Sequence, residues 1–92
     1  MNIELRHLRY FVAVAEEASF TAAARRVHVA QQVLSTQIRQ LEDAVGARLL
    51  DRSSRGVALT PAGEALLITA RDTLATLDRG VSAARPRRRL RS

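Results

Sequence analysis

The stretch SFTAAARRVHVAQQVLSTQIRQLEDAVG, residues 19–46, decides the fold of this chain. Its pattern predicts two short helices that are separated by only a few residues. In the second helix, apolar residues recur at spacings of three and four, which places Leu34, Ile38, Leu41 and Val45 on one face. A stripe of this kind is typical of a helix that packs on a core.

The opposite face of this second helix is polar. It carries Gln32, Thr36 and Arg39, and Ser35 and Gln40 lie beside them. Amides, hydroxyls and guanidinium groups form hydrogen bonds with base edges in the major groove of DNA. No acidic residue occurs from residue 18 to residue 41, so a phosphate backbone can approach without repulsion. The stretch therefore predicts a helix-turn-helix.

The neighbouring segments predict the rest of the domain. Residues 4–18 form a first helix, and Thr21 is the expected cap of the next helix, residues 22–27. Gly46 ends the third helix, because glycine is the usual residue past a helix C-terminus. Helical periodicity is lost in residues 47–59, where two short apolar runs flank the polar segment RSSRG, so we expect a β-wing. Thr60 and Pro61 start a fourth helix as its cap and first residue.

A heptad pattern runs through the fourth helix, residues 61–84. Its apolar positions alternate steps of three and four, as do positions a and d of a coiled coil. Packing on the chain's own core is the preferred role of Leu66, Ile68 and the first turn. The later turns extend too far from a small domain to be covered by it. We therefore expect a dimerisation surface, for which the candidate residues are Leu67, Ala70, Leu74, Leu77 and Val81.

Length and composition fit one small domain with an extension. The chain has 92 residues and a formal net charge of +6, but its excess of arginine lies in residues 85–92. Arg85 and Pro86 stop the fourth helix, and we expect the arginine-rich tail, residues 85–92, to be disordered. The absence of cysteine excludes disulfides and thiolate metal sites. Without a signal segment or an apolar run of membrane-spanning length, the expected location is the cytoplasm.

The order and spacing of four motifs resemble one protein family. The motifs SFTAAA, LSTQIRQLE, GARLLDR and LTPAG follow one another within residues 5–77 as they do in the DNA-binding domain of LysR-type transcriptional regulators. The resemblance implies a mainly α fold, with a winged helix-turn-helix in residues 1–60 and a linker helix in residues 61–84. Linker helices of two subunits pair, usually antiparallel, and place the homodimer on an interrupted inverted repeat of double-stranded DNA. Helix 31–45 would lie in the major groove and wing 52–56 in the minor groove.

Full-length members of this family carry a larger ligand-binding domain. No part of the 92 residues encodes such a domain, so the resemblance implies a truncated regulator or an isolated DNA-binding domain. A small-molecule effector would bind only the missing domain, and tetramers would form only in a full-length protein. We expect no cofactor and no membrane partner.

The third helix departs from the family pattern at three positions. The family commonly opens this helix with Ser-Gln-Pro and continues with Leu-Ser-Arg-Gln. Here Ala30 removes a capping hydroxyl, Gln32 replaces the proline, and Thr36 replaces a frequent base-reading arginine. Gln32 can add a bidentate contact with adenine, whereas Thr36 is too short for the contact of an arginine with guanine. The positions that match are Gln31, Ser35 and Gln37.

The candidate DNA contacts differ in how they are expected to act. Gln31 and Gln37 flank the core stripe, so two interpretations are open for each: a contact with phosphate or backbone, or a contact with a base. Arg39 faces outward, which favours a phosphate contact over a solvated role. Of Arg25 and Arg26, one is expected to contact phosphate and the other to be solvated. The full candidate set is Gln31, Gln32, Val33, Ser35, Thr36, Gln37 and Arg39 in the third helix, Arg52, Ser53, Ser54 and Arg55 in the wing, and Arg25 and Arg26 at the DNA backbone.

The wing offers two arginines with different expected roles. Arg55 stands beside Gly56, whose backbone freedom allows a close approach to DNA. Arginine inserts favourably into a narrow A·T-rich minor groove, because the potential there is strongly negative. Arg52 follows Asp51, so an ion pair within the wing and a phosphate contact are both open interpretations.

Other function classes have less support in the sequence. His7 and His28 are isolated, which favours core or surface positions and no metal site. Ser53 and Ser54 have no histidine base nearby, and no glycine-rich phosphate loop is present, so we expect no catalytic residues. The alternative is a helical interaction module whose basic tail binds anionic membrane or RNA. That alternative leaves the outer face of the third helix arbitrary, whereas this face is rich in hydrogen-bonding groups.

Overall fold

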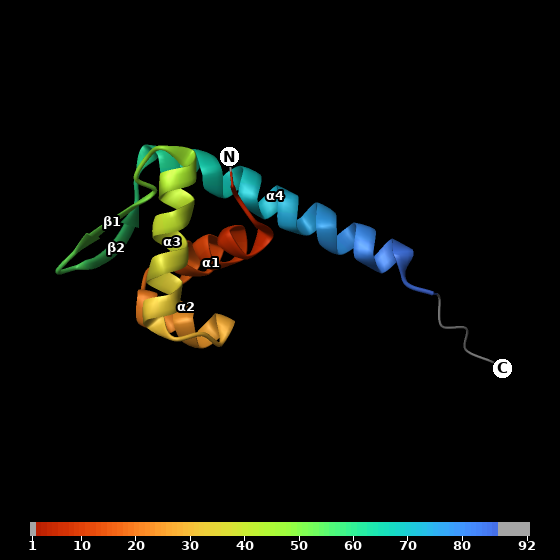
Figure 1. Cartoon of the computed structure of the whole chain (residues 1–92), viewed down its shortest axis with the longest axis horizontal. Helices are drawn as coiled ribbons and strands as arrows, with labels where there is room; N and C mark the ends of the chain where they lie inside the picture. Colours follow the sequence, from red (N-terminus) through yellow and green to blue (C-terminus); the bar gives the residue numbers. More distant parts are fainter. Residues whose placement is uncertain (1, 87–92) are drawn as a thin grey trace.

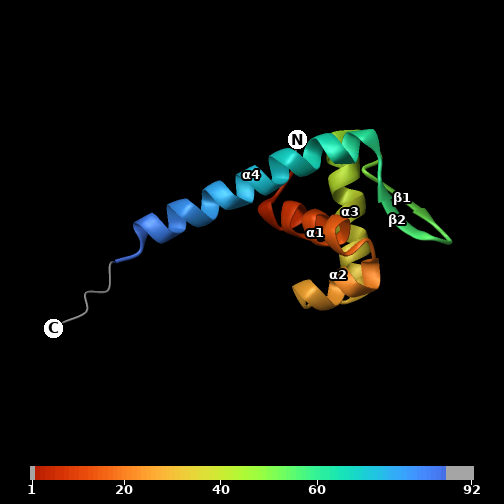
Figure 2. The same ribbon diagram turned by 180° about the vertical axis from the view of Figure 1, so that it is seen from behind.

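A computed structural model of the chain describes residues 2–86 (Figure 1). Within these residues, four helices and one antiparallel hairpin follow one another, which confirms the predicted fold class. The second half of the last helix extends away from the other elements (Figures 1 and 2). The elements are α1 (Leu5–Glu17), α2 (Phe20–Val27), α3 (Gln31–Val45), β1 (Leu50–Ser53), β2 (Gly56–Leu59) and α4 (Pro61–Ala84).

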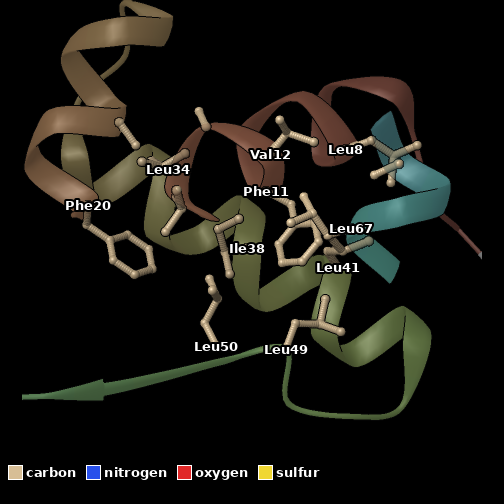
Figure 3. Close-up of a cluster of buried hydrophobic side chains, with 14 of the residues drawn as sticks. Leu8, Phe11, Val12, Phe20, Leu34, Ile38, Leu41, Leu49, Leu50 and Leu67 are labelled. Atoms are coloured by element: carbon tan, nitrogen blue, oxygen red, sulfur yellow. The ribbon is translucent and has the colours of Figure 1, made fainter. Parts of the chain in front are cut away.

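The core lies where α1, α3 and the first half of α4 meet (Figure 3). Leu34 and Leu41 of α3 are fully buried, as the stripe of the third helix predicts, and Phe11 of α1 is fully buried beside them. Leu49 is also fully buried, and it lies in the segment that connects α3 to the hairpin. Val45 is a correction, because this last residue of α3 is 38% exposed and lies outside the core.

The start of α2 differs from the sequence-based expectation. Ser19, and not Thr21, is the N-cap, because the Ser19 hydroxyl accepts a hydrogen bond of 3.1 Å from the backbone N–H of Ala22. The helix therefore begins at Phe20, and the side chain of this residue is buried. The hydroxyl of Thr21 instead donates to the side chain of Gln31.

The ends of α3 and the hairpin follow the predicted pattern. Gly46 caps α3 with a φ of 83°, a left-handed conformation that glycine adopts without strain. Strands β1 and β2 pair in antiparallel register, with Arg52 opposite Val57. The carboxylate of Glu42 accepts hydrogen bonds from the backbone N–H groups of Leu49 and Leu50 at 2.8 and 3.3 Å. This carboxylate ties α3 to the base of the hairpin.

Helix α4 begins at the predicted residue and is held close to the hairpin. The Thr60 hydroxyl accepts a hydrogen bond from the N–H of Gly63, and Pro61 is the first helical residue. A Cβ atom at Gly63 would lie 2.1 Å from the carbonyl oxygen of Leu49. Only glycine therefore permits this approach of α4 to the segment before β1.

The heptad stripe of α4 divides into two parts, which corrects the predicted dimerisation surface. Leu67 and Ala70 are buried in the chain's own core, because α1 packs against this part of α4. Leu74 is half-buried against the same core, whereas Val81 is 40% exposed in the part that extends beyond it. Ile68 is a second correction, since it is 67% exposed and does not pack on the core.

The C-terminal end of α4 agrees with the predicted end of the helix. Arg85 is the C-cap of α4, and its extended backbone is followed by Pro86. Most of the arginine-rich tail, residues 87–92, lies outside the described residues. Within residues 2–86, no helix is long and apolar enough to cross a membrane.

Candidate nucleic-acid interface

The candidate interface consists of α3 and the hairpin β1–β2, which projects away from the helices (Figure 1). Four of the exposed residues on the outward side of α3 form what we call the reading face: Gln32, Val33, Thr36 and Arg39. Val33 is 46% exposed, unlike the apolar residues of the core stripe, and it lines a shallow depression together with Gln32, Thr36 and Gln37. The reading face thus combines amide, hydroxyl, methyl and guanidinium groups on one side of a helix.

Two residues predicted as DNA contacts also bond to other helices of the chain. Gln37 accepts a hydrogen bond of 3.0 Å from Nε of Arg6, at the start of α1. The side chain of Gln31 accepts a hydrogen bond of 3.1 Å from the hydroxyl of Thr21 in α2. No local pattern identifies Arg6 as a partner of Gln37, because a residue separated by about thirty positions meets α3 only through the fold.

Beside Gln37, the side chain of Gln40 meets the buried His7 of α1. His7 is only 3% exposed, and its Nε2 lies 3.2 Å from Oε1 of Gln40. Its Nδ1 accepts a hydrogen bond from the backbone N–H of Glu4. Both ring nitrogens are thus bonded, which confirms that His7 is a core histidine.

Arg52 connects the hairpin to both helices of the helix-turn-helix. Its guanidinium lies over the ring of Phe20, 3.8 Å from the centroid, and Nη2 donates to the hydroxyl of Ser35 at 3.3 Å. Asp51 pairs with Arg48 at 3.8 Å, and Arg52 makes no ion pair within residues 2–86, so the structure does not contain the ion pair that was one of the two open interpretations of Arg52. The physical reason is that alternate strand residues face opposite sides, which turns Arg52 toward α3 and its neighbour away.

A groove of about 600 Å³ lies between α3 and the hairpin. Arg39, Arg48 and Arg52 line it, and they bring three guanidinium groups from three segments to one place. Glu42 and Asp43 also line this groove. Arg48 was not among the predicted contacts, because its position before β1 does not reveal that it faces α3.

The tip of the hairpin is exposed. Ser53, Ser54 and Arg55 all reach solvent, and the Ser53 hydroxyl accepts a hydrogen bond from the backbone N–H of Arg55 at 3.1 Å. Gly56 follows with a φ of 120°, which a residue with a side chain adopts only under strain. Within residues 2–86, the guanidinium of Arg55 has no hydrogen-bond or ion-pair partner, so it is free to contact a ligand.

The two arginines of α2 have different environments. Arg26 pairs with Glu16 at 2.7 Å and with Glu17 at 3.3 Å, so it is neither simply solvated nor free for a phosphate. The hydrogen bond from Arg26 lowers the pKa of Glu16, and the hydrogen bond from Arg71 of α4 lowers it further. Arg25 is exposed and has no ion pair within residues 2–86.

The described residues offer no site for a metal ion. His28 is the C-cap of α2, with a φ of 61°, and lies on a different helix from His7. Within residues 2–86, no group of three or more histidine, cysteine, aspartate or glutamate side chains could hold a metal.

Comparison with known proteins agrees with this geometry. Residues 5–64 match the family described as "Bacterial regulatory helix-turn-helix protein, lysR family". The HTH-type transcriptional regulator YnfL of Escherichia coli (strain K12) is 54% identical over 84 residues, which cover 91% of this chain and 28% of YnfL. The Hca operon transcriptional activator HcaR of the same organism is 54% identical over 81 residues, which cover 88% of this chain and 26% of HcaR. The chain therefore spans about a quarter of the length of these relatives.

A solved structure has the same fold together with DNA. The crystal structure of the BenM DNA-binding domain in complex with catB site 1 DNA superposes with a TM-score of 0.85 and 51% sequence identity. The match covers 88% of this chain and 91% of that one. The family match spans more than half of the chain and includes α1 to the start of α4. The chain belongs to the LysR family of bacterial helix-turn-helix regulatory proteins.

Proposed function

We propose that this chain binds double-stranded DNA in a sequence-specific manner, as the DNA-binding part of a LysR-type transcriptional regulator. The observation that carries the proposal is the exposed reading face of α3, next to a hairpin with a free arginine at its tip. The BenM domain, which shares the fold at 51% identity, was solved as a DNA complex.

In this proposal, α3 lies in the major groove. Gln32 reads an adenine by donating and accepting one hydrogen bond each, as glutamine does at the edge of that base. Thr36 and Val33 offer methyl groups to the same groove. Arg39 contacts phosphate at the edge of the reading face, and Arg25, which has no ion pair within residues 2–86, contacts phosphate from α2.

The hairpin supplies the second contact in this proposal. Arg55 enters the minor groove from the exposed tip, where Ser53 and Ser54 contact the adjacent backbone. Arg52 has a different role, because its guanidinium is stacked on Phe20 and bonded to Ser35. It holds the hairpin at a fixed distance from α3, so that both elements meet the duplex together.

The active form in this proposal is a homodimer that reads an interrupted inverted repeat. Leu77 and Val81 lie on the part of α4 beyond the core, and Leu74 lies at its border, so these residues form the pairing surface. Recognition helices of the two subunits enter major grooves about one helical turn of DNA apart, or a multiple of it. Effector binding and tetramer formation belong to the further domain of a full-length regulator, and the site of action is the DNA of the cytoplasm.

The direct test is selection of bound sequences from a randomised duplex pool, followed by a gel shift and a footprint. The expected result is an inverted repeat, two protected half-sites, and binding that persists when residues 85–92 are deleted. Binding that disappears with these residues would show that the basic tail carries it. A footprint of a single half-site at saturating protein would contradict the dimer.

A further inference from the structure

Polar side chains border the reading face of α3 on both sides, and their acceptor atoms are already bonded within the chain. On one side, Arg6 donates to Oε1 of Gln37 at 3.0 Å. On the other, Arg52 donates to Oγ of Ser35 at 3.3 Å. A guanidinium group has only donors, so Gln37 must turn its oxygen toward Arg6 and its NH₂ group away from it. The hydroxyl hydrogen of Ser35 is likewise left to donate elsewhere.

The same argument applies to Gln40 through the buried ring of His7. The backbone N–H of Glu4 can only donate, and it donates to Nδ1 of His7 at 3.0 Å. The proton of the neutral imidazole is therefore on Nε2, which lies 3.2 Å from Gln40. Because Nε2 donates, Gln40 must present its oxygen to the ring and its NH₂ group to the outside. Neither assignment depends on which amide atom is drawn as oxygen.

We propose that the outward NH₂ groups of Gln37 and Gln40 and the hydroxyl hydrogen of Ser35 donate to phosphate oxygens at the two edges of the major groove. This inference rests on the proposed function. The non-bridging oxygens of phosphate accept hydrogen bonds and never donate, so they fit the two amides, whose orientation the fold has fixed, and the free hydrogen of Ser35. The phosphate backbones also lie at the borders of a groove that a helix enters.

In this arrangement, the side chains that position α3 on the phosphate backbone differ from the side chain that reads a base. The outward NH₂ group of Gln37 or Gln40 can only donate, so it cannot accept a hydrogen bond from the amino group of adenine or cytosine and cannot complete a bidentate contact with adenine. Gln32, on the reading face, has no hydrogen-bond partner within residues 2–86 and can both donate and accept. Discrimination of adenine therefore falls to Gln32 and not to Gln37 or Gln40, although all three lie on the same helix.

The test is a double-mutant cycle between side chains and single phosphates. The selected duplex is prepared with one methylphosphonate at a time along each strand, which removes one charged acceptor oxygen. Gln37→Met keeps the length of the side chain and removes its donors, and Ser35→Ala removes the hydroxyl. In the wild-type chain, neutralising the contacted phosphate is expected to lower the affinity for the duplex about tenfold, which is the effect of losing a hydrogen bond to a charged group. Gln37→Met should abolish that penalty at one phosphate per half-site.

Gln32→Met is the matched control, since it makes the same change on the same helix. In this variant, the loss of affinity that each methylphosphonate causes should be the same as in the wild-type chain. The preference for one base pair should instead fall. If Gln37→Met couples only to a base pair and to no phosphate, the inference is wrong while the proposed function stands. If the wild-type chain binds no duplex from the pool, the proposed function fails and this inference fails with it.

A second measurement tests the fixed polarity without DNA. Long-range proton–nitrogen correlation spectra of the free 92-residue chain identify the protonated nitrogen of each imidazole. The expected result is a proton on Nε2 of His7 and none on Nδ1. A proton on Nδ1 would leave Gln40 free to donate to the ring and would overturn its assignment. Circular dichroism of the variants shows whether the fold is kept.

Discussion

Arg55 lies at the exposed hairpin tip, where its charge has no partner within residues 2–86. Arg55→Ala is expected to weaken binding to every sequence and to lower the slope of log affinity against log salt by about one unit, the loss of one phosphate-like contact. It should also reduce any preference for A·T pairs beside the half-sites. Binding titrations at several salt concentrations measure the slope.

Arg55→Lys is the control for this change, because it keeps the charge and loses the planar guanidinium. It should restore most of the salt slope but not the A·T preference. If Arg55→Ala changes neither the affinity nor the slope, the hairpin does not contact DNA.

Gln32 is expected to act on sequence preference and hardly at all on general affinity. Gln32→Ala removes the amide that can read adenine, and a good bidentate pair contributes about 1–3 kcal/mol of discrimination. Repeating the selection with this variant should lose the preference at one position of each half-site. Affinity for unrelated duplex should stay nearly constant, since phosphate contacts provide it. An unchanged selected sequence would show that Gln32 does not face a base.

At the scale of elements, local signals were predictable from the sequence and distant contacts were not. The Gly46 helix end and the start at Thr60 and Pro61 were correct, because these residues act through their own backbone preferences. The cap of α2 was misplaced by two residues, because serine and threonine both occur there and either can cap a helix. Local reasoning cannot decide between two such neighbours.

The contacts of the candidate site required the fold. The stacking of Arg52 on Phe20 joins residues from the hairpin and α2, which no periodicity relates. The role of Leu67 in α4 also could not be predicted from the sequence. Its heptad position fits both a core and a helix pair, and only the position of α1 shows that the core contains it. The sequence could identify the face of each helix that is apolar, but not what covers it.

An ion-pair cluster joins three elements and makes a prediction about pH. Glu16 of α1 accepts hydrogen bonds from Arg26 of α2 and Arg71 of α4, and these lower its pKa below the usual 4.5. A carboxylate with a lowered pKa stabilises the fold above its unfolded pKa, and this contribution is lost as the pH falls through the folded pKa. The pairs are partly exposed, so we expect a contribution below about 1 kcal/mol.

Urea unfolding of the wild-type chain and of Glu16→Gln, at a series of pH values, checks this prediction. The difference in free energy of unfolding should be constant above pH 4.5 and shrink below it. Asp72→Asn is the control, because Asp72 takes part in no ion pair within residues 2–86. A difference that does not change with pH would show that Glu16 stabilises the fold through packing alone.

At the scale of the whole molecule, the two halves of α4 have different surroundings. The first half closes the core through Leu67 and Ala70 (Figure 3). The second half continues the same apolar face in the part of α4 that extends away from the other elements (Figure 2). Val81 lies in this half and is 40% exposed. An apolar helix face of this length is stable in water when a second helix packs on it.

The dimer can therefore be tested by a substitution that leaves the core intact. Val81→Asp places a charge on the exposed part of the apolar face, and we expect monomers in sedimentation, with unchanged helical content. Leu74→Asp would be less informative, because Leu74 also packs on the chain's own core. Ala83→Asp is the matched control, since residue 83 lies about 200° around the helix from residue 81, given a step of 100° per residue. If Val81→Asp sediments as a dimer like Ala83→Asp, the subunits pair through another surface, and the exposed Ile68 becomes the first position to test.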